Sequence, residues 1–262
     1  MFPLGLAYIA SKLKKSGHRV DILNINHYCG PVNLIINNLV NERNDYDYIC
    51  TGGISTFYNQ IKEVVEAVKK TTCKAKVIIG GGLVSSEPEL IINKLMPDYA
   101  ILGEGEEAIL ELIECLSNGG EIRKVDGVVF IGKAGELVFT RSRAPLENLD
   151  LLPYPDFEGF EFSKYLDHMH PSDLYAYDLF DYPRAYPIIC SRSCPYQCTF
   201  CFHPIGKKYR QRSIESIMRE LEENVPRYRI NIISIYDELF SRDRERVIEF
   251  CGRIKDFLAK LD

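Results

Sequence analysis

Three features that would assign the protein to a membrane, to the secretory pathway or to nucleic acid are absent from the sequence. No apolar run reaches the roughly 18 residues that a membrane-spanning helix needs. The opening residues, Met1-Phe-Pro-Leu-Gly5, have neither a basic start nor a small-residue cleavage site, so we expect no signal peptide. A net charge of −5 argues against a global basic field for nucleic acid. The composition, 46% hydrophobic and 26% charged, is that of a globular protein.

The cysteines argue against a disulfide framework. There are nine, an odd number, and four of them fall within residues 190–201. Such clustering fits metal binding in a reducing cytosol better than disulfide pairing, so we expect a cytoplasmic protein. Other thiols are scattered through the first half, where we expect them to be buried and to act as small hydrophobes. These are Cys29, Cys50, Cys73 and Cys115.

The cluster contains the most informative motif, Cys194-Pro-Tyr-Gln-Cys198-Thr-Phe-Cys201. It follows a strand-like run at 186–190. Three thiolates on one tight loop can occupy three corners of a cubane and leave the fourth iron without a protein ligand, the open position that catalytic metal sites keep. The alternative is a zinc site of three Cys and His203, although zinc sites more usually pair C-x2-C units.

Short apolar segments alternate with amphipathic ones up to about residue 116, which predicts a parallel, doubly wound sheet. The expected strands are 18–25, 48–52, 76–80 and 99–103. The expected helices are 4–15, 32–42, 57–70, 88–95 and 106–116. Such a sheet normally begins with a strand, whereas this chain begins with a helix, so we expect a truncated or misassigned N-terminus.

The second half predicts a hairpin, a linker and a second alternating block. Runs at 127–131 and 136–140 flank Gly-Lys-Ala-Gly, a hairpin signal. A proline-rich linker at 149–156 and an irregular stretch at 157–184 follow. The second block is expected to contain a strand from 186, the cysteine loop, helices 213–225 and 242–258, and a strand 230–236.

The expected domains are 1–120, a hairpin and linker region 121–184, and a C-terminal block 185–262. Ser213 is expected to cap the first helix of that block. A full eightfold barrel needs roughly 250 residues, far more than follow Cys201. We therefore expect a fragment that is itself inactive.

Beyond the cysteine motif, four further segments carry a resemblance to a known family. They are Pro3-Leu-Gly-Leu-Ala-Tyr-Ile-Ala10, Gly80-Gly-Gly82, Gly103-Glu-Gly-Glu106 and the linker Leu149-Asp-Leu-Leu-Pro-Tyr-Pro-Asp156. In this order the chain resembles the cobalamin-binding subclass of radical S-adenosylmethionine (radical SAM) enzymes. The resemblance implies an α/β fold: a doubly wound, flavodoxin- or Rossmann-like cobalamin-binding domain, then the first βα units of a radical SAM partial (β/α) TIM barrel.

The resemblance also implies where cobalamin would bind. Ligands of open α/β sheets bind beyond the carboxyl ends of the strands, where glycine lets backbone approach them. The expected cobalamin contacts are Ser55, Thr56, Gly80, Gly81, Gly82, Gly103 and Glu104. The alternative is that these are ordinary turns without a ligand. The Asp-x-His-x-x-Gly motif of classical cobalamin domains is missing, and we expect His27 to be a loop histidine without a ligand role.

After the last expected strand, Asp237 and Glu238 resemble the segment that accepts hydrogen bonds from the amino group of S-adenosylmethionine, and carboxylates suit an ammonium group. The alternative is a solvated pair at a helix entry, favoured by the helix dipole. The arginines of Tyr209-Arg-Gln-Arg212 could clamp a carboxylate or phosphate, or lie in water.

By this resemblance, Cys194, Cys198 and Cys201 would hold a 4Fe-4S cluster. With S-adenosylmethionine it would generate a 5′-deoxyadenosyl radical, and cobalamin would supply a methyl group. The resemblance further implies a small-molecule substrate and a reductant such as flavodoxin or ferredoxin. Methylation, ring formation and other rearrangements stay open, and no catalytic residue is assigned. Two alternatives are a radical SAM enzyme with a non-cobalamin scaffold and a non-catalytic iron–sulfur or metal-binding protein.

Overall fold

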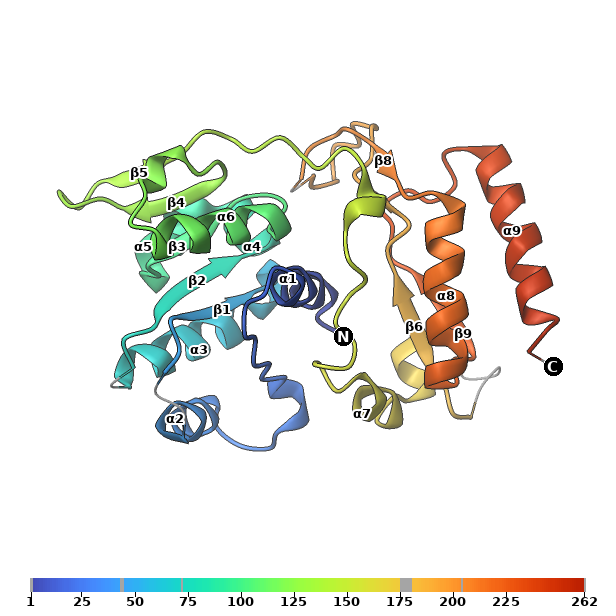
Figure 1. Ribbon diagram of the computed structural model, residues 1–262, viewed down its shortest axis with the longest axis horizontal. Helices are drawn as coiled ribbons and strands as arrows, with labels where there is room; N and C mark the ends of the chain where they lie inside the picture. The colour runs from blue at the N-terminus through green and yellow to red at the C-terminus, as the bar shows by residue number, and fades with distance from the viewer. Residues whose placement is uncertain (1, 43–44, 72, 175–180, 204, 262) are drawn as a thin grey trace. The chain divides into compact units, whose positions relative to one another are not determined.

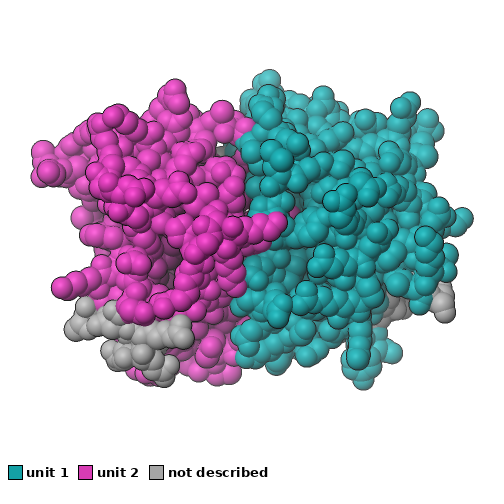
Figure 2. Space-filling view, in the orientation of Figure 1, with its two compact units in different colours: residues 1–4, 146–262 teal, residues 5–145 magenta. Residues whose placement is uncertain are grey.

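A computed structural model describes most of the chain (Figure 1). The described residues are 2–42, 45–71, 73–174, 181–203 and 205–261. The chain divides into two compact units, which Figure 2 colours separately. Unit 1 comprises residues 1–4 and 146–262, and unit 2 comprises residues 5–145. No helix formed by the described residues combines the length and apolarity needed to cross a membrane.

Unit 2 is built on a five-stranded mixed sheet with the order β1-β2-β3-β4-β5. Its strands are β1 (Tyr48–Gly52), β2 (Lys76–Gly80), β3 (Tyr99–Ile101), β4 (Val128–Ile131) and β5 (Leu137–Phe139). The first three are parallel, and the hairpin β4–β5 adds two antiparallel strands at the β3 edge. The expected hairpin is therefore formed, as a continuation of the same sheet.

Helices cover both faces of this sheet (Figure 1). They are α1 (Leu4–Lys15), α2 (Val32–Glu42), α3 (Tyr58–Lys70), α4 (Gly82–Ser86), α5 (Pro88–Leu95) and α6 (Glu106–Ser117). Successive side chains of a strand point to opposite faces. Val77 and Ile79 accordingly pack into a core with α2 to α5, whereas Ile78 packs into a second core with α1 and α6. The predicted doubly wound α/β arrangement is confirmed.

The expected strand at 18–25 is wrong. Within the described residues this segment joins no sheet ladder, and its end belongs to the 3₁₀ helix Ile25–His27. Its apolar side chains are nevertheless partly buried: Val20 packs against one core and Leu23 against the other. The apolar alternation therefore reports burial, but a strand also needs a neighbour to accept and donate its backbone hydrogen bonds.

Unit 1 contains a parallel pair of strands joined through a helix. β6 (Ala185–Ile188) pairs with β9 (Ile232–Ile235), and the intervening chain contains α8 (Ile214–Tyr228). Helix α9 (Arg244–Leu258) follows β9. A short antiparallel pair, β7 (Ser191–Arg192) with β8 (Arg210–Gln211), lies within the crossover. Ser213 caps α8 as expected, because its side chain accepts a hydrogen bond from the Ser216 amide.

The stretch expected to be irregular contains a helix. α7 (Phe162–Asp167) begins with buried Phe162, whose ring packs edge-on against Tyr186 of β6 and Tyr228 of α8. Residues 175–180 of this stretch lie outside the described part. Further 3₁₀ helices are Ser55–Phe57, Ile122–Lys124, Leu149–Leu151 and Pro171–Leu174.

Candidate functional sites

The three cysteines of the motif lie on one loop of unit 1, between β7 and β8. Cys194 is half-buried, and Cys198 and Cys201 are exposed; all three are free thiols. The Cys201 amide donates to the Cys198 carbonyl at 3.1 Å, which folds the last part of the motif into a turn. Among the described side chains, no three Cys, His, Asp or Glu are close enough together to hold a metal ion. The donor set itself, three thiols on one short loop, fits a cubane cluster.

Aromatic side chains of this loop are turned outward. Phe200 is 91% exposed, and Tyr196 and Phe202 are also exposed. At the end of the motif, His203 buries both ring nitrogens without a hydrogen-bond partner in the described residues. Its Nδ1 lies 3.9 Å from Glu238 Oε2. His203 therefore lies near the carboxylate of Glu238.

The base of the cysteine loop is closed by β7 and β8. The Ser191–Gln211 and Arg192–Arg210 pairs bring its two ends together. Ser193 follows with a left-handed backbone (φ 66°), which is uncommon for a residue with a side chain. Its buried hydroxyl accepts a hydrogen bond from Arg210 Nη2 at 3.1 Å. Arg210 is thus an internal brace of the loop, neither a free anion clamp nor a solvated side chain as the sequence analysis allowed.

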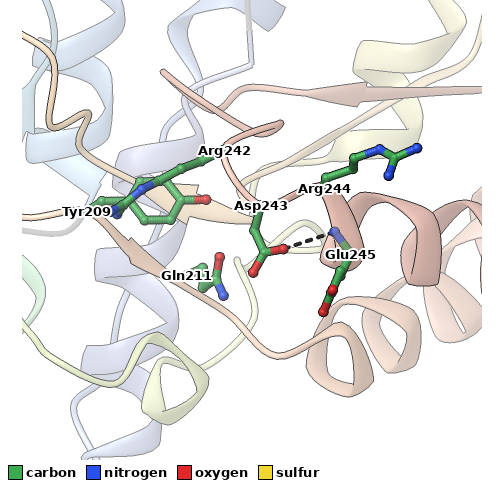
Figure 3. A pocket seen from close by; sticks show the side chains of 6 residues that line it. All are labelled: Tyr209, Gln211, Arg242, Asp243, Arg244 and Glu245. Carbon is green, nitrogen blue, oxygen red and sulfur yellow. Dashed lines mark hydrogen bonds between the residues drawn. The ribbon is translucent and has the colours of Figure 1, made fainter.

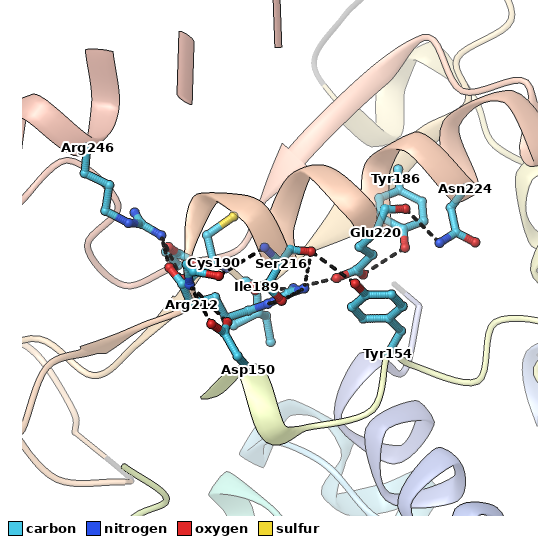
Figure 4. Close-up of polar contacts among 12 residues, drawn as sticks. Asp150, Tyr154, Tyr186, Ile189, Cys190, Arg212, Ser216, Glu220, Asn224 and Arg246 are labelled. Carbon is cyan, nitrogen blue, oxygen red and sulfur yellow. Dashed lines mark hydrogen bonds and ion pairs between the residues drawn. The ribbon is translucent and has the colours of Figure 1, made fainter. Parts of the chain in front are cut away.

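Arg212 is also internal, and it belongs to a buried polar network (Figure 4). Its Nη1 donates to Glu220 Oε2 of α8 at 2.5 Å and to the Ile189 carbonyl at 3.1 Å. Tyr186 of β6 donates its hydroxyl proton to Glu220 Oε1 at 2.9 Å. The network therefore joins the strand that leads into the cysteine loop to the helix that follows it. Arg212 thus holds a carboxylate of the protein itself, that of Glu220, and the solvated alternative is wrong.

The two carboxylates after β9 have different surroundings. Asp237 Oδ1 accepts from the Cys190 amide at 2.7 Å, and Oδ2 accepts from Ser191 Oγ at 2.6 Å. Burial raises the pKa of Asp237, and these hydrogen bonds oppose the rise. Glu238 has a side chain that is 33% exposed, and burial likewise raises its pKa. The two neighbours thus contact opposite ends of the cysteine loop segment.

In unit 2, the loops after the three parallel strands lie at one edge of the sheet, because the carboxyl ends of parallel strands coincide. The first two loops touch through glycine: the Gly53 amide donates to the Gly80 carbonyl at 3.2 Å. A Cβ at Gly81 would lie 2.7 Å from the Gly53 oxygen. The third loop is tied to the second because the Gly103 amide donates to Ser85 Oγ at 2.9 Å.

The remaining expected cobalamin contacts are open to solvent to different degrees. Ser55 and Thr56 are exposed in the 3₁₀ helix after β1, and Glu104 is half-buried after β3. Gly82 begins α4 and is half-buried.

His27 lies away from these loops in sequence, and its Nε2 is 3.0 Å from Asn24 Nδ2. The four scattered thiols are not the buried hydrophobes expected, since Cys29 and Cys50 are exposed and Cys73 and Cys115 are half-buried.

Sequence reasoning missed a hollow in unit 1 at the start of α9 (Figure 3). Its volume is about 610 Å³, and it is lined by Tyr209, Gln211, Arg242, Asp243, Arg244 and Glu245. Asp243 caps α9, accepting from the Glu245 amide at 3.0 Å. The Arg242 guanidinium lies over the Tyr209 ring, 4.8 Å from its centroid. The charged run Arg242-Asp243-Arg244-Glu245-Arg246, which extends into the first turn of α9, was the only sequence signal for it.

Comparison with known proteins adds three sequence relatives. Residues 1–113 match the family model of the B12-binding domain. Over 97% of its length the chain is 28% identical to an uncharacterised methyltransferase of Pyrococcus horikoshii, covering 52% of that protein. It is 26% identical to cytidylyl-2-hydroxyethylphosphonate methyltransferase of Streptomyces wedmorensis (97% and 54% coverage). It is 24% identical to anaerobic magnesium-protoporphyrin IX monomethyl ester cyclase of Rubrivivax gelatinosus (96% and 44%).

Two solved structures share the fold. The radical S-adenosylmethionine methyltransferase TsrM of Kitasatospora setae matches 99% of this chain and 48% of its own, with a TM-score of 0.72 and 16% identity. The cobalamin-dependent S-adenosylmethionine radical enzyme OxsB matches 96% and 34%, with a TM-score of 0.75 and 19% identity. The chain therefore spans about half the length of the curated relatives it matches.

Proposed function

We propose that this chain, which carries a B12-binding domain and is a relative of the cobalamin-binding radical SAM proteins, serves radical S-adenosylmethionine chemistry on a small organic molecule. Methyl transfer is the leading reaction, because the relatives above include methyltransferases. A ring-forming reaction is the second candidate, supported by the relative named as a cyclase.

One observation carries the proposal: three free thiols lie on a single loop whose two ends are paired as β7 and β8. A loop closed at its base can present Cys194, Cys198 and Cys201 to one 4Fe-4S cluster while its fourth iron stays without a protein ligand. The exposed ring of Phe200 would cover such a cluster and limit the access of water. Buried Cys190 stays outside the ligand set, since burial raises the pKa of its thiol.

Glu238 is the residue that we propose for the amino group of S-adenosylmethionine. Its side chain is partly exposed and follows β9, the parallel neighbour of the strand that leads into the cysteine loop. A carboxylate suits an ammonium group through a charge-assisted hydrogen bond. Asp237, the second member of the expected pair, has both carboxylate oxygens engaged by hydrogen bonds from the protein.

The loops at the sheet edge of unit 2 are the proposed cobalamin site. The match of residues 1–113 to the B12-binding domain supports it, as do the exposed Ser55 and Thr56. Gly80, Gly81, Gly82, Gly103 and Glu104 complete the proposed contact set. We propose that these loops hold the corrin and its tail, while the absence of side chains at the glycines lets backbone approach the ligand.

When bound, the cluster with S-adenosylmethionine supplies a carbon radical, and cobalamin supplies a methyl group. The protein's own contribution is to bind and orient these groups and to exclude water and oxygen. Because the chemistry consumes electrons, we propose a small reductant such as flavodoxin or ferredoxin as the partner. A cytoplasmic setting would keep the loop thiols reduced.

Anaerobic reconstitution tests the proposal. The chain is incubated with iron, sulfide and a thiol reductant, and then with hydroxocobalamin and S-adenosylmethionine. We expect about four irons per chain, with retention of both small molecules. Iron uptake without cobalamin would favour a radical SAM protein with a non-cobalamin scaffold. Iron uptake without S-adenosylmethionine binding would favour a non-catalytic iron–sulfur protein, and zinc with no iron would contradict the proposal.

A further inference from the structure

We propose that Asp237 is a positioning residue that fixes the base of the cysteine loop, and that it leaves its neighbour Glu238 to meet the ligand. The inference deepens the proposed function and rests on it for the identity of the cluster. Its geometrical part, the bracing of the loop by Asp237, concerns the protein alone.

Both carboxylate oxygens of Asp237 accept hydrogen bonds from the base of the cysteine loop. Oδ1 accepts the Cys190 amide at 2.7 Å, and Oδ2 accepts the Ser191 hydroxyl at 2.6 Å. Hydrogen bonds to an ionised acceptor are the short, strong class. They span 46 and 47 residues of sequence, so a side chain after β9 fixes the chain just before Cys194.

The carbonyl of the same residue, Cys190, is held as well as its amide. The Cys190 carbonyl accepts from the Arg212 amide at 2.9 Å and from Arg246 Nη2 at 3.1 Å. Arg246 is buried, and its Nη2 also donates to the Arg212 carbonyl at 3.1 Å. Cys190 is therefore clamped through its N–H by Asp237 and through its C=O by residues of β8–α8 and α9 (Figure 4 shows the carbonyl side).

The clamp on Cys190 lies just before the backbone that leads into the first cysteine of the motif. Ser193, three residues after Cys190, adopts the left-handed backbone, which persists where the surroundings fix it. Cys194 follows directly. A change in the direction of the chain at Cys190 and Ser191 would move the first thiol relative to the other two. Three thiols must meet one cluster, so the clamp acts on cluster assembly.

Glu238 is arranged differently. Its Oε2 is 3.9 Å from His203 Nδ1, beyond hydrogen-bond distance, so the carboxylate is not committed to that neighbour. Its residue is exposed, whereas Asp237 is half-buried. The two adjacent acidic residues thus have different roles. Asp237 holds the base of the cysteine loop, and Glu238 remains accessible at the far end of the cysteine segment.

Hydrogen exchange of the metal-free chain tests the clamp without any cofactor. The variants are Asp237→Ala, Asp237→Asn and Ser191→Ala, with Glu249→Ala as a control for the loss of an exposed carboxylate on α9. Asp237→Ala should speed exchange of the 190–193 amides roughly tenfold, the change expected for a lost buried hydrogen bond. Asp237→Asn keeps one acceptor for the Cys190 amide and should lose less protection. If Asp237→Ala does not fold, Asp237→Asn and Ser191→Ala carry the test.

Cluster assembly and ligand affinity complete the design. Asp237→Ala should lower the iron bound on reconstitution and the absorbance at about 400 nm, while Asp237→Asn restores most of both. In the reconstituted Asp237→Asn chain, S-adenosylmethionine affinity should stay within about twofold of the native chain, whereas Glu238→Gln should keep its iron and lose affinity roughly tenfold or more.

Native exchange and native iron content in Asp237→Ala would overturn the inference. So would full iron with affinity lost in Asp237→Asn as in Glu238→Gln, since Asp237 would then be a ligand contact. If the native chain takes up no iron, the proposed function fails, but the exchange measurement still decides whether Asp237 braces the loop.

Discussion

Gly81 and Gly53 meet backbone to backbone in unit 2: a Cβ at Gly81 would lie 2.7 Å from the Gly53 carbonyl oxygen. That same oxygen accepts the Leu83 amide at 2.9 Å, so it cannot move away without loss of a hydrogen bond. Gly81 also has a φ of +88°, a conformation that side chains rarely adopt. Glycine at position 81 is therefore required by the fold, whether or not a ligand covers it.

The neighbouring glycine provides a matched comparison. At Gly80 the nearest atom to an added Cβ is the Ile101 oxygen at 3.7 Å, an ordinary contact. We expect Gly81→Ala to lower the free energy of unfolding by about 2 kcal/mol or more, and Gly80→Ala by less than about 1 kcal/mol. Urea unfolding measures both. Equal losses would show that the loop backbone adjusts more freely than its contacts indicate.

Cobalamin binding calls for a substitution that leaves this backbone contact intact. Ser55 is exposed in the 3₁₀ helix after β1, so Ser55→Trp adds bulk at the proposed ligand edge. We expect this variant to lose hydroxocobalamin retention in equilibrium dialysis. Asn118→Trp is the control, because Asn118 is exposed at the C-terminal end of α6, by the amino ends of the strands. Equal retention by both variants would remove the proposed site from this edge.

Iron binding should depend on three thiols and not on the others. Replacing Cys194, Cys198 or Cys201 by Ala should abolish the broad absorption at about 400 nm after reconstitution, since each would supply one of three corners. Cys251→Ala is the control, because that thiol is exposed on α9. Metal analysis that found zinc in the native chain, lost in His203→Ala, would instead support the tetrahedral alternative.

The predictable part of the fold is the part with local signals. The strands Tyr48–Gly52 and Lys76–Gly80 have the predicted bounds, because each is a short run rich in β-branched residues that ends at glycine. The segment 18–25 has a similar alternation but lacks a pairing neighbour in the described sheet. Helix α7 was missed because its packing on Tyr186 and Tyr228 depends on residues distant in sequence.

The candidate site likewise has one part that could be predicted from the sequence and one part that could not. The three thiols share eight residues of sequence, so their common loop could be predicted. The roles of Arg210 and Asp237 could not, because their partners lie 17 residues away at Ser193 and 47 residues away at Cys190. Exposed arginines and buried ones look alike in a sequence, and only the tertiary contacts separate them.

Glu238 should affect both the affinity for S-adenosylmethionine and the pH dependence of the free energy of unfolding. If it meets the ammonium group, Glu238→Ala should weaken S-adenosylmethionine binding by about 1.5–3 kcal/mol, the range for hydrogen bonds to charged groups. Isothermal titration of the reconstituted protein measures this. Unchanged affinity would leave Glu238 as a residue of the helix entry, whose charge interacts only with the helix dipole.

The pH dependence follows from burial, which raises the pKa of Glu238 above its ordinary value of 4.5. At pH values well below 4.5 both folded and unfolded chains carry the proton. As the pH rises, the unfolded chain releases this proton before the folded chain does. The free energy of unfolding of the unmutated protein therefore falls, whereas that of Glu238→Gln has no such contribution. Urea unfolding between about pH 4 and 7 should show the difference growing in favour of the variant. A difference that is independent of pH would contradict the raised pKa.

The Arg212–Glu220 pair offers the largest stability effect. Glu220 is fully buried and accepts from both Arg212 and Tyr186, so removing it takes the carboxylate from a buried guanidinium and an acceptor from the Tyr186 hydroxyl. We expect Glu220→Ala to lower the free energy of unfolding by about 3–5 kcal/mol, as for other broken buried pairs. The double variant Arg212→Met/Glu220→Leu should lose less free energy of unfolding than Glu220→Ala, because it leaves no unpaired charge.

The same double variant tests whether the network positions the cysteine loop. Since Arg212 also donates to the Ile189 carbonyl, just before the clamped Cys190, the double variant should still bind less iron than the native chain. Native iron content in that variant would show that the network stabilises the fold without positioning the cysteine loop.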